Sequence, residues 1–170
     1  SRRPDVAADV AAVVGAAPGA VVLRSDVVRK RLLGVAPEAA LAKDAYSGEM
    51  TRRVYAHLRA LARRALAAGA TVILDAVHGG AGERDAAAAL AAAAAVPFSG
   101  LWLEAPPAVL RSRVAARHGD ASDATLRVLE GQLERGAGDI AWARLDAAGA
   151  PGNVSTAALS VLARAGIEAR

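Results

Sequence analysis

The sequence contains no cysteine, which excludes a disulfide framework and any metal site built on thiolate ligands. Histidine is also scarce, and His57, His78 and His118 do not stand at the spacing of a zinc site. Aromatic residues make up only 3% of the chain, so few rings are present that could stack on nucleic-acid bases. We therefore expect neither a zinc site nor nucleic acid as a partner.

Several segments that mark other classes of protein are also missing. No stretch resembles a signal peptide or a transmembrane helix, because the alanine-rich run at residues 86–96 is too short and too weakly apolar to span a bilayer. There is no Gly-x-Ser-x-Gly, which argues against an α/β-hydrolase, and no Gly-x-Gly-x-x-Gly after a strand, which argues against a dinucleotide fold. The default expectation is a cytoplasmic protein of bacterial type with no membrane partner.

The chain is rich in apolar residues and has more basic than acidic residues. Hydrophobic residues account for 54% of its 170 residues, but many of these are alanine, which buries little area. The length suits one domain, residues 1–170, whose core must rest on valine, leucine and isoleucine. The formal net charge is +4, which suits anionic ligands such as nucleotides.

Strand and helix patterns alternate along the chain. Short β-branched or apolar runs predict strands, and amphipathic or alanine-rich stretches next to glycine or proline predict helices. The expected strands span residues 20–23, 71–74, 98–103 and 141–145, and the expected helices span residues 5–14, 27–33, 48–68, 83–95, 108–117, 123–135 and 154–165. This alternation predicts an α/β fold, in which a parallel sheet has helices on both faces.

The first expected strand leads directly into a basic helix, and Asp26 lies at the junction. Ligands of open α/β sheets bind at the carboxyl ends of the strands. Asp26 could therefore take a proton from a hydroxyl group while Arg29, three residues later, holds an anion. The alternative is structural: Asp26 would cap the helix and Arg29 would be solvated. The local spacing alone leaves the two interpretations at even odds.

Two further features indicate bound phosphates. Asp75 ends the apolar run at residues 72–74, which is the pattern of a residue that holds Mg²⁺ directly or through water, although such an aspartate can also cap a loop. Arg113 and Arg117 are four residues apart on one helix face and lead into a polar loop. That segment could close over phosphates, and the alternative is a solvated basic face.

Taken together, these pieces resemble the P-loop kinases of the AAA-type ATP-binding family. More narrowly, they resemble the ATP-binding domain fused behind an aminoglycoside-phosphotransferase-like domain in bacterial proteins. Polynucleotide kinases, zeta-toxin kinases and gluconate-kinase-like enzymes are more distant relatives. The matching segments follow in order and are residues 18–26, 30–32, 46, 54–55, 72–76, 97–106 and 117–124. The resemblance implies a three-layer P-loop kinase-like sandwich, ATP and Mg²⁺ as cofactors, and a helical lid around residues 107–136.

The resemblance also implies roles for individual residues on the acceptor side. Asp26 would be the catalytic base or the orienting group for the acceptor hydroxyl. Arg29 would position the acceptor, and Arg24 would also bind it. Asp75 would lie near Mg²⁺.

On the nucleotide side, the resemblance implies that Arg113 and Arg117 are lid arginines on the transferred phosphoryl group, and that Arg117 also binds the nucleotide. The family's phosphate-binding loop, Gly-x-x-x-x-Gly-Lys-[Ser/Thr], should enter the first helix, but its last three positions fall here on residues 2–4. Arg3 would supply the lysine's charge in nucleotide binding, whereas Pro4 has neither a hydroxyl for Mg²⁺ nor an N–H for phosphate. The strand before this loop lies in the middle of the family's sheet, so its absence would leave two inner edges unpaired.

The sequence therefore predicts an amino-terminally incomplete, ATP-dependent phosphotransferase domain. Its acceptor would be a small hydroxylated molecule or a nucleotide-type molecule, and the chain as given would be inactive because the phosphate-binding loop is absent. A fused or upstream phosphotransferase domain is a further expected partner. The alternative is a degenerate, non-catalytic domain that binds nucleotide weakly or serves in interactions. Residues 35–47, where the acceptor would bind, carry no motif that identifies it.

Overall fold

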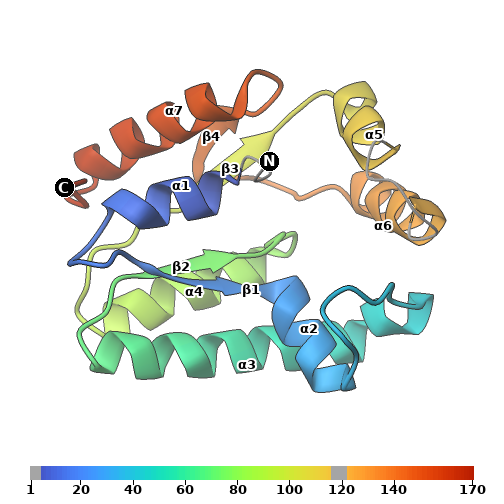
Figure 1. Ribbon diagram of the computed structural model, residues 1–170, viewed down its shortest axis with the longest axis horizontal. Helices are drawn as coiled ribbons and strands as arrows, with labels where there is room; N and C mark the ends of the chain where they lie inside the picture. The colour runs from blue at the N-terminus through green and yellow to red at the C-terminus, as the bar shows by residue number, and fades with distance from the viewer. Residues whose placement is uncertain (1–4, 116–121) are drawn as a thin grey trace.

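The computed structural model describes residues 5–115 and 122–170, and within these ranges strands and helices alternate (Figure 1). The strands are β1 (Val21–Arg24), β2 (Val72–Asp75), β3 (Leu101–Glu104) and β4 (Ala143–Asp146). The helices are α1 (Val6–Val13), α2 (Ser25–Leu33), the 3-10 turn η1 (Lys43–Tyr46), α3 (Gly48–Ala67), α4 (Ala81–Ala93), α5 (Pro107–Ala115), α6 (Ser122–Arg135) and α7 (Pro151–Arg164). The predicted α/β class with parallel strands is confirmed.

The strands form two separate parallel pairs instead of one continuous sheet. β1 pairs with β2, so that Arg24 lies opposite Asp75, and β3 pairs with β4, so that Leu101 lies opposite Ala143. Within the described ranges, β2 and β3 each have one hydrogen-bonded neighbouring strand. The second edges of β2 and β3 therefore have no strand partner in the described residues, which agrees with the two unpaired inner edges expected from the family resemblance.

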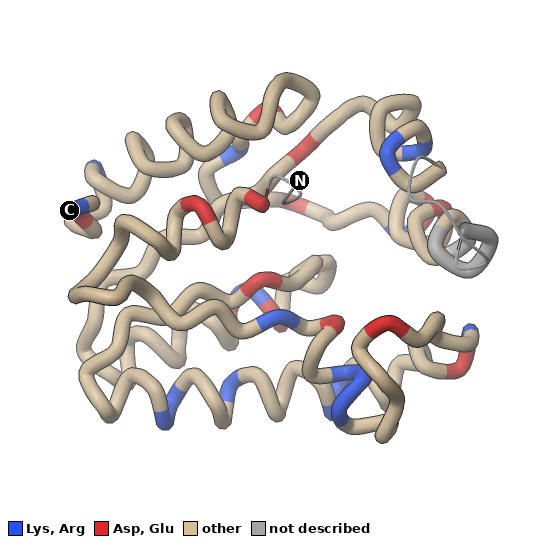
Figure 2. Tube along the Cα trace, viewed as in Figure 1, with Lys and Arg blue, Asp and Glu red and all other residues tan. Residues whose placement is uncertain are grey.

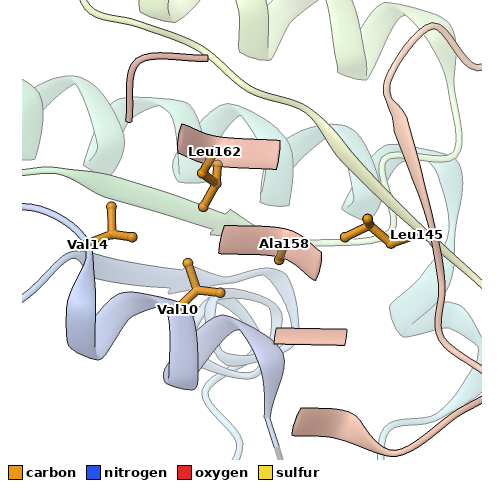
Figure 3. Packing of buried hydrophobic residues seen from close by; sticks show 5 residues of the cluster. All are labelled: Val10, Val14, Leu145, Ala158 and Leu162. Carbon is orange, nitrogen blue, oxygen red and sulfur yellow. The ribbon is translucent and has the colours of Figure 1, made fainter. Parts of the chain in front are cut away.

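One face of the strands is covered by α1 and α7. These two helices lie side by side and contact each other, although they come from opposite ends of the chain (Figure 1). Their packing centres on a buried cluster shown in Figure 3, formed by Val10, Val14, Leu145, Ala158 and Leu162. Full burial of such a branched side chain is worth about 1.5–3 kcal/mol. This cluster therefore holds β4 and the two helices together.

The opposite face carries α3 and α4, and α2 packs against α3. The second core cluster consists of Val28, Val54, Tyr55 and Leu58. Its three members from α3 are Val54, Tyr55 and Leu58, whose spacing places them on one face of this helix. The helix begins where Ser47 Oγ accepts a hydrogen bond from the Met50 N–H at 3.2 Å. This contact fixes the amino-terminal end of α3, which directly follows η1.

α1 runs antiparallel to β1. Asp5 caps its amino end and forms an ion pair with Arg24, the last residue of β1. Near the other end of α1, the Ala20 N–H donates to the Ala11 carbonyl at 2.9 Å. Gly19, with φ +132°, permits this approach, because a Cβ at that position would overlap the Ala11 carbonyl oxygen. The chain therefore enters α1 at the carboxyl edge of the strands.

Element boundaries differ from the predicted ones where tertiary contacts decide them. β3 begins at Leu101 and not at Phe98, because its pairing with β4 begins at Leu101, opposite Ala143; the Phe98 ring packs edge-on against Trp142, with the ring centroids 5.9 Å apart. α2 begins at Ser25, two residues before the expected start at Val27, directly after β1 ends. The strand-to-helix junction is thus tighter than the sequence pattern suggests.

α5 and α6 pack against each other in the region that the sequence assigns to a helical lid. The Arg111 guanidinium on α5 donates to both carboxylate oxygens of Glu130 on α6, at 2.7 and 3.0 Å, and this ion pair is exposed. Most of the polar loop expected between these helices lies outside the described residues. No helix in the described parts of the chain is long and apolar enough to cross a membrane.

Candidate functional site

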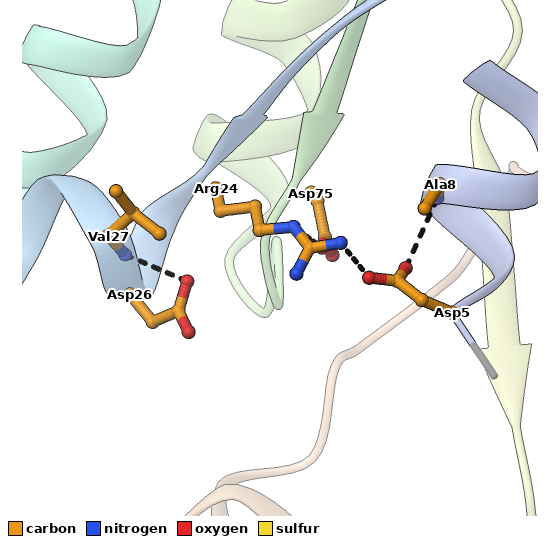
Figure 4. A network of polar contacts seen from close by, with 6 residues as sticks. All are labelled: Asp5, Ala8, Arg24, Asp26, Val27 and Asp75. Atoms are coloured by element: carbon orange, nitrogen blue, oxygen red, sulfur yellow. Dashed lines mark hydrogen bonds and ion pairs between the residues drawn. The ribbon is translucent and has the colours of Figure 1, made fainter. Parts of the chain in front are cut away.

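The carboxyl end of the β1–β2 pair gathers the charged residues that the sequence singles out. Arg24 and Asp75 are the last residues of the two strands and lie opposite each other. α2 starts at the next residue and places Asp26 in its first turn. Figure 4 shows these three side chains together with Asp5 from the start of α1, and in Figure 2 basic and acidic segments follow each other where β1 leads into α2.

Arg24 connects two elements at this edge. Its guanidinium forms an ion pair with Asp5, while its Nε lies 3.5 Å from Asp75 Oδ2. Asp5 also accepts a hydrogen bond from the Ala8 N–H at 3.2 Å, which caps α1. The position of α1 is therefore coupled to the charges at the strand ends.

The surroundings of Asp75 disfavour its charged form. Burial raises the pKa of its carboxyl group, the Arg24 guanidinium opposes this rise, and the negative charge of Asp26 adds to it. The two carboxylates are thus close enough to interact. A cation bound between or beside them would be stabilised by both charges, and raised carboxylate pKa values of this kind often mark functional sites.

Asp26 does not cap α2, so the structural alternative for this residue is wrong. The N-cap position is Arg24, and it makes no side-chain capping bond. Asp26 Oδ1 accepts a hydrogen bond from the N–H of the next residue, Val27, at 2.8 Å. The side chain is exposed at the strand edge, where an acceptor molecule could reach it.

Arg29 is buried, so the expectation of a solvated arginine is also wrong. It is 7% exposed, its Nη1 donates to the Ala45 carbonyl at 2.6 Å, and its guanidinium lies over the Tyr46 ring at 4.9 Å from the centroid. Desolvation lowers the pKa of this guanidinium, and the nearby Tyr46 and Tyr55 oppose that shift. Arg29 thereby holds η1 against α2.

His78 belongs to the site, although its sequence environment gave it no partner. It is 4% exposed and packs against Tyr55 and Trp142, with ring centroids 5.3 and 5.2 Å apart. Its backbone N–H donates to the Tyr55 hydroxyl at 2.8 Å, and its Nδ1 lies 3.2 Å from the Ala76 carbonyl. Burial lowers the pKa of the His78 ring and raises the pKa of Tyr55 to about 12. Both groups are therefore held neutral at pH 7.

Arg84 is a second residue that sequence reasoning missed. It is 5% exposed, and its guanidinium donates to four backbone carbonyls at 2.8–3.2 Å, those of His78, Gly79, Ala137 and Asp139. It also lies 5.8 Å from the centroid of the Trp102 ring. The one signal in the sequence is that Arg84 stands between Glu83 and Asp85 at the start of an alanine-rich helix. Arg84 joins the loop after β2 to the segment that precedes β4.

The arginines predicted to act on the nucleotide do not lie with the charged residues at the ends of β1 and β2. Arg113 is exposed on α5 and donates to the carbonyls of residues 147–149 at 2.6–3.3 Å, which fastens α5 to the loop between β4 and α7. Arg117 and Arg3 lie outside the described residues. The structure therefore brings Arg24, Asp26 and Asp75 together, with Arg29 one turn away, while Arg113 is directed at backbone.

A large cavity of about 2070 Å³ connects these residues. Its lining includes Arg24, Asp26, Arg29, Asp75 and Arg113. The cavity extends from the carboxyl edge into the space between β2 and β3. One continuous space thus reaches both the charged residues at the ends of β1 and β2 and the arginine on α5.

The residues at this edge fit a magnesium ion that is completed by other ligands. No group of three or more histidine, aspartate or glutamate side chains that could hold a metal occurs in the described residues. Mg²⁺, however, is usually bound by one or two carboxylates together with substrate phosphates and water. Asp75, whose contact with Arg24 is long at 3.5 Å, and its neighbour Asp26 meet that requirement.

Comparison with known families decides where the chain belongs. The family described as the AAA domain matches residues 9–137, which is most of the chain. The chain belongs to the AAA domain family. None of the curated proteins matches the sequence.

Solved structures resemble this AAA domain in fold. A sugar kinase from Janibacter sp. HTCC2649 has a TM-score of 0.63 and 21% identity, over 93% of this chain and 86% of that chain. The tunicamycin resistance protein of Deinococcus radiodurans has a TM-score of 0.54 and 13% identity, over 96% and 91% of the two chains. A gluconokinase from Sinorhizobium meliloti 1021 has a TM-score of 0.52 and 21% identity, over 85% and 78%. The kinase-like α/β fold expected from the sequence is thereby confirmed.

Proposed function

We propose that this AAA domain is an ATP-dependent phosphotransferase that acts on a small hydroxylated acceptor. The observation that carries the proposal is the pair of interacting carboxylates, Asp26 and Asp75, at the carboxyl edge of two paired strands. Arg24 lies beside them, and all three line the same cavity. A carboxylate for the acceptor hydroxyl and a second one for a metal ion are the two anionic groups that phosphoryl transfer requires.

Asp26 would accept the proton of the acceptor hydroxyl, and Arg29 would position the acceptor. General-base assistance of this kind contributes about 10²–10⁴ in rate. Arg29 uses Nη1 for the Ala45 carbonyl, and a guanidinium has further N–H groups to offer an acceptor. A second, smaller cavity of about 250 Å³, lined by Asp26, Lys30 and Arg31 among others, lies on this side.

Asp75 would hold Mg²⁺ on the nucleotide side. When bound, the ion would supply positive charge that neutralises the negative charge developing on the phosphates during transfer. Arg113 and Arg117 would act on the transferred phosphoryl group from the helical lid formed by α5 and α6, and Arg3 would bind the nucleotide. For Arg113 this role requires that α5 release the carbonyls of residues 147–149.

The phosphate-binding loop sets the condition for activity. The sequence contains no Gly-x-x-x-x-Gly-Lys-[Ser/Thr], and neither of its lysines, Lys30 and Lys43, follows a glycine. Backbone N–H groups of such a loop bind phosphates without competition from side chains. We therefore expect phosphoryl transfer from a form that carries this loop before α1, and none from the 170-residue chain.

Two of the similar structures are named as a sugar kinase and a gluconokinase, which supports a small hydroxylated acceptor. A second candidate is a non-catalytic domain that binds nucleotide or another protein. The contact of Arg24 with Asp75 and the attachment of Arg113 to backbone favour this second candidate, because both occupy groups that catalysis needs.

The test compares two forms of the protein. One is the 170-residue chain, and the other carries a strand and a Gly-x-x-x-x-Gly-Lys-Ser loop upstream of Asp5. Both are titrated with Mg·ATP while Tm is followed, and both are assayed for ADP release with a panel of sugars, sugar acids and polyols. At a free ATP concentration ten times Kd, binding stabilises the folded state by about 1.4 kcal/mol, which raises Tm by roughly 3–6 °C.

The proposal expects this Tm shift and acceptor-dependent ADP release from the extended form alone. A Tm shift without ADP release on any acceptor would support the non-catalytic nucleotide-binding domain. No shift in the extended form would favour an interaction domain. Turnover by the 170-residue chain would contradict the stated need for the loop.

A further inference from the structure

The net positive charge of the chain is concentrated on α3. This helix carries five arginines and a single acidic residue, Glu49. Its charge of +4 equals the formal net charge of the 170-residue chain, so the remaining residues contain as many acidic as basic side chains. Figure 2 shows basic segments at intervals along this helix, which lies at one border of the molecule in the view of Figure 1. The five arginines are Arg52, Arg53, Arg59, Arg63 and Arg64.

The arginines of α3 have no acidic partner among the described residues. The ion pairs found there are formed by Arg24, Arg111 and Arg144. Arg59 and Arg63 are four residues apart, a spacing at which like charges repel each other on a helix. Arg59 is half-buried, and the other four arginines of α3 are exposed. The fold therefore gains no ion pair from this charge, which is available to a partner outside the molecule.

The arginines form two parallel rows along the helix. Arg52 and Arg63 are eleven residues apart, which corresponds to three turns or about 16 Å of helix. Arg53 and Arg64 repeat this spacing. Successive residues of a helix point about 100° apart, so the second row lies beside the first on the outer side of α3. Between the rows lies the exposed Ala56. We call this surface, formed by the five arginines and the alanines between them, the arginine face.

The apolar side of α3 is already used for packing. Val54 and Ala62 are 0% exposed, and Leu58 is 1% exposed. Apart from its charged residues, the exposed positions of α3 hold only alanine and glycine. A helix that enters a membrane surface needs a large apolar face, and a protein interface is built around an apolar core. The arginine face offers neither, so its binding must depend on charge and hydrogen bonds.

The arginine face fits phosphate groups that are arranged in two lines. All five of its cations are arginine, whose planar guanidinium donates paired hydrogen bonds to phosphate oxygens. A helix with its side chains is about 10–12 Å across, and the major groove of B-form DNA is about 12 Å wide. The two rows can therefore face the two phosphate backbones that border one groove. Along each backbone, about 16 Å corresponds to about five base-pair steps.

The scarcity of aromatic residues favours a duplex over a single strand. Aromatic rings bind single strands by stacking on their unpaired bases, and aromatic residues make up only 3% of this chain. Duplex DNA is bound mainly through contacts of arginine and lysine with phosphates, and these contacts need no aromatic ring. The expectation that nucleic acid is no partner rests on stacking and therefore applies to single strands only.

We propose that the arginine face of α3 binds double-stranded DNA through the phosphates on both sides of a groove. The contact does not read the base sequence, because the alanine between the rows has no side-chain hydrogen-bonding group. Both cavities are lined by other residues. The proposal goes beyond the proposed function and does not rest on it, and its test uses no nucleotide.

The experiment measures fluorescence anisotropy of a fluorescein-labelled DNA duplex of mixed sequence and about 16 base pairs, with NaCl varied between about 50 and 200 mM. Arg53→Gln/Arg64→Gln removes one row and keeps good helix-forming residues. The control Arg135→Gln/Arg164→Gln removes the same charge from exposed arginines of α6 and α7. Arg53→Lys/Arg64→Lys keeps the charge of the row, and the Tm of every variant is measured.

For five phosphate contacts, a plot of log K against log salt concentration should have a slope of about −4.5. Arg53→Gln/Arg64→Gln should reduce the slope to about −3 and weaken binding at low salt at least about tenfold. The control and the lysine variant should bind within about threefold of the unaltered chain. These results together would support the arginine face as the binding surface.

Equal losses in the two glutamine variants would overturn the proposal, because net charge alone would then account for binding. No binding of the unaltered chain at about 50 mM NaCl, or a slope shallower than about −2, would also overturn it, whether or not the variants fold. Binding to phosphatidylcholine–phosphatidylserine vesicles but not to the duplex would assign the arginine face to a membrane and overturn it. Tighter binding to the single strand than to the duplex would contradict the arrangement of the two rows.

Discussion

The two strand pairs end in similar sequences but hold their acidic residues in different ways. β2 ends in Leu-Asp, and β3 and β4 end in Leu-Glu and Leu-Asp. At the end of the first pair, Asp75 has a second carboxylate, Asp26, beside it and a single long contact with Arg24. At the end of the second pair, Glu104 accepts a hydrogen bond from Arg144 at 2.9 Å, and this ion pair is exposed.

The difference shows that an acid at the end of a strand is a weak indicator of function by itself. What distinguishes the first pair is a second acid from the next helix, together with burial that raises the pKa of Asp75. In the second pair a cation on the neighbouring strand already balances the charge of Glu104. The following substitutions test whether this difference matters for activity and for stability.

The largest effect is expected for Asp26→Asn in the form that carries the phosphate-binding loop. Loss of the proton acceptor should lower turnover by about 10²–10⁴, while the Tm shift with Mg·ATP should persist. Glu104→Gln is the matched control at the end of the other pair and should keep turnover within about twofold. Unchanged turnover in Asp26→Asn, or an equal loss of turnover in both variants, would show that the acidic residues at the ends of the two strand pairs do not differ in function.

The second-largest effect concerns Arg84, which connects the β1–β2 pair with the β3–β4 pair. Arg84→Ala leaves four buried or partly buried carbonyls without their donor, so we expect a loss of about 3 kcal/mol in the free energy of unfolding. For a chain of this length that lowers Tm by roughly 6–12 °C. The control Arg111→Ala breaks only an exposed ion pair and should leave the free energy of unfolding almost unchanged. Urea denaturation of both variants measures their free energies of unfolding. Similar decreases in the two variants would show that Arg84 does not connect the two strand pairs.

The smallest effect is a gain in stability from Asp75→Asn. Since the folded protein raises the pKa of Asp75 above its ordinary value, the folded state binds the proton more tightly than the unfolded state. The carboxylate therefore destabilises the folded state once the pH exceeds the raised pKa, and this penalty vanishes below the ordinary pKa. Asp75→Asn should raise Tm slightly at pH 7 and lose that advantage near pH 3, whereas Glu104→Gln should not raise Tm at pH 7. A lower Tm for Asp75→Asn at pH 7 would mean that the contact with Arg24 outweighs the penalty.

Most of the fold follows from the sequence because its strands are short apolar runs set between long helical patterns. The four strands and seven α-helices of the described residues lie where the patterns predict them, within a few residues. One of the largest errors is the start of β3, which lies at Leu101 and not at Phe98 because pairing with a strand far away in the sequence, β4, begins only there. The division of the described strands into two pairs could not be predicted from local patterns, and only the family resemblance suggested it.

The site was less predictable. The sequence placed Asp26 and Asp75 at strand ends, which depends on local pattern alone. It did not show that Arg29 is buried under Tyr46, nor that His78 and Arg84 are buried. These positions depend on contacts between segments far apart in the chain, such as that of Arg84 with the carbonyl of Asp139. A charged side chain in an alanine-rich helix gives no local sign of such a partner.

The most direct test of the central claim is a pH titration of the carboxyl carbons by NMR in the ¹³C-labelled chain. The claim is that burial and Asp26 together disfavour the charged form of Asp75. The account predicts that Asp75 titrates above the ordinary aspartate pKa, and that Asp26→Asn moves this pKa downward. An Asp75 pKa at or below the ordinary value that does not respond to Asp26→Asn would contradict the account.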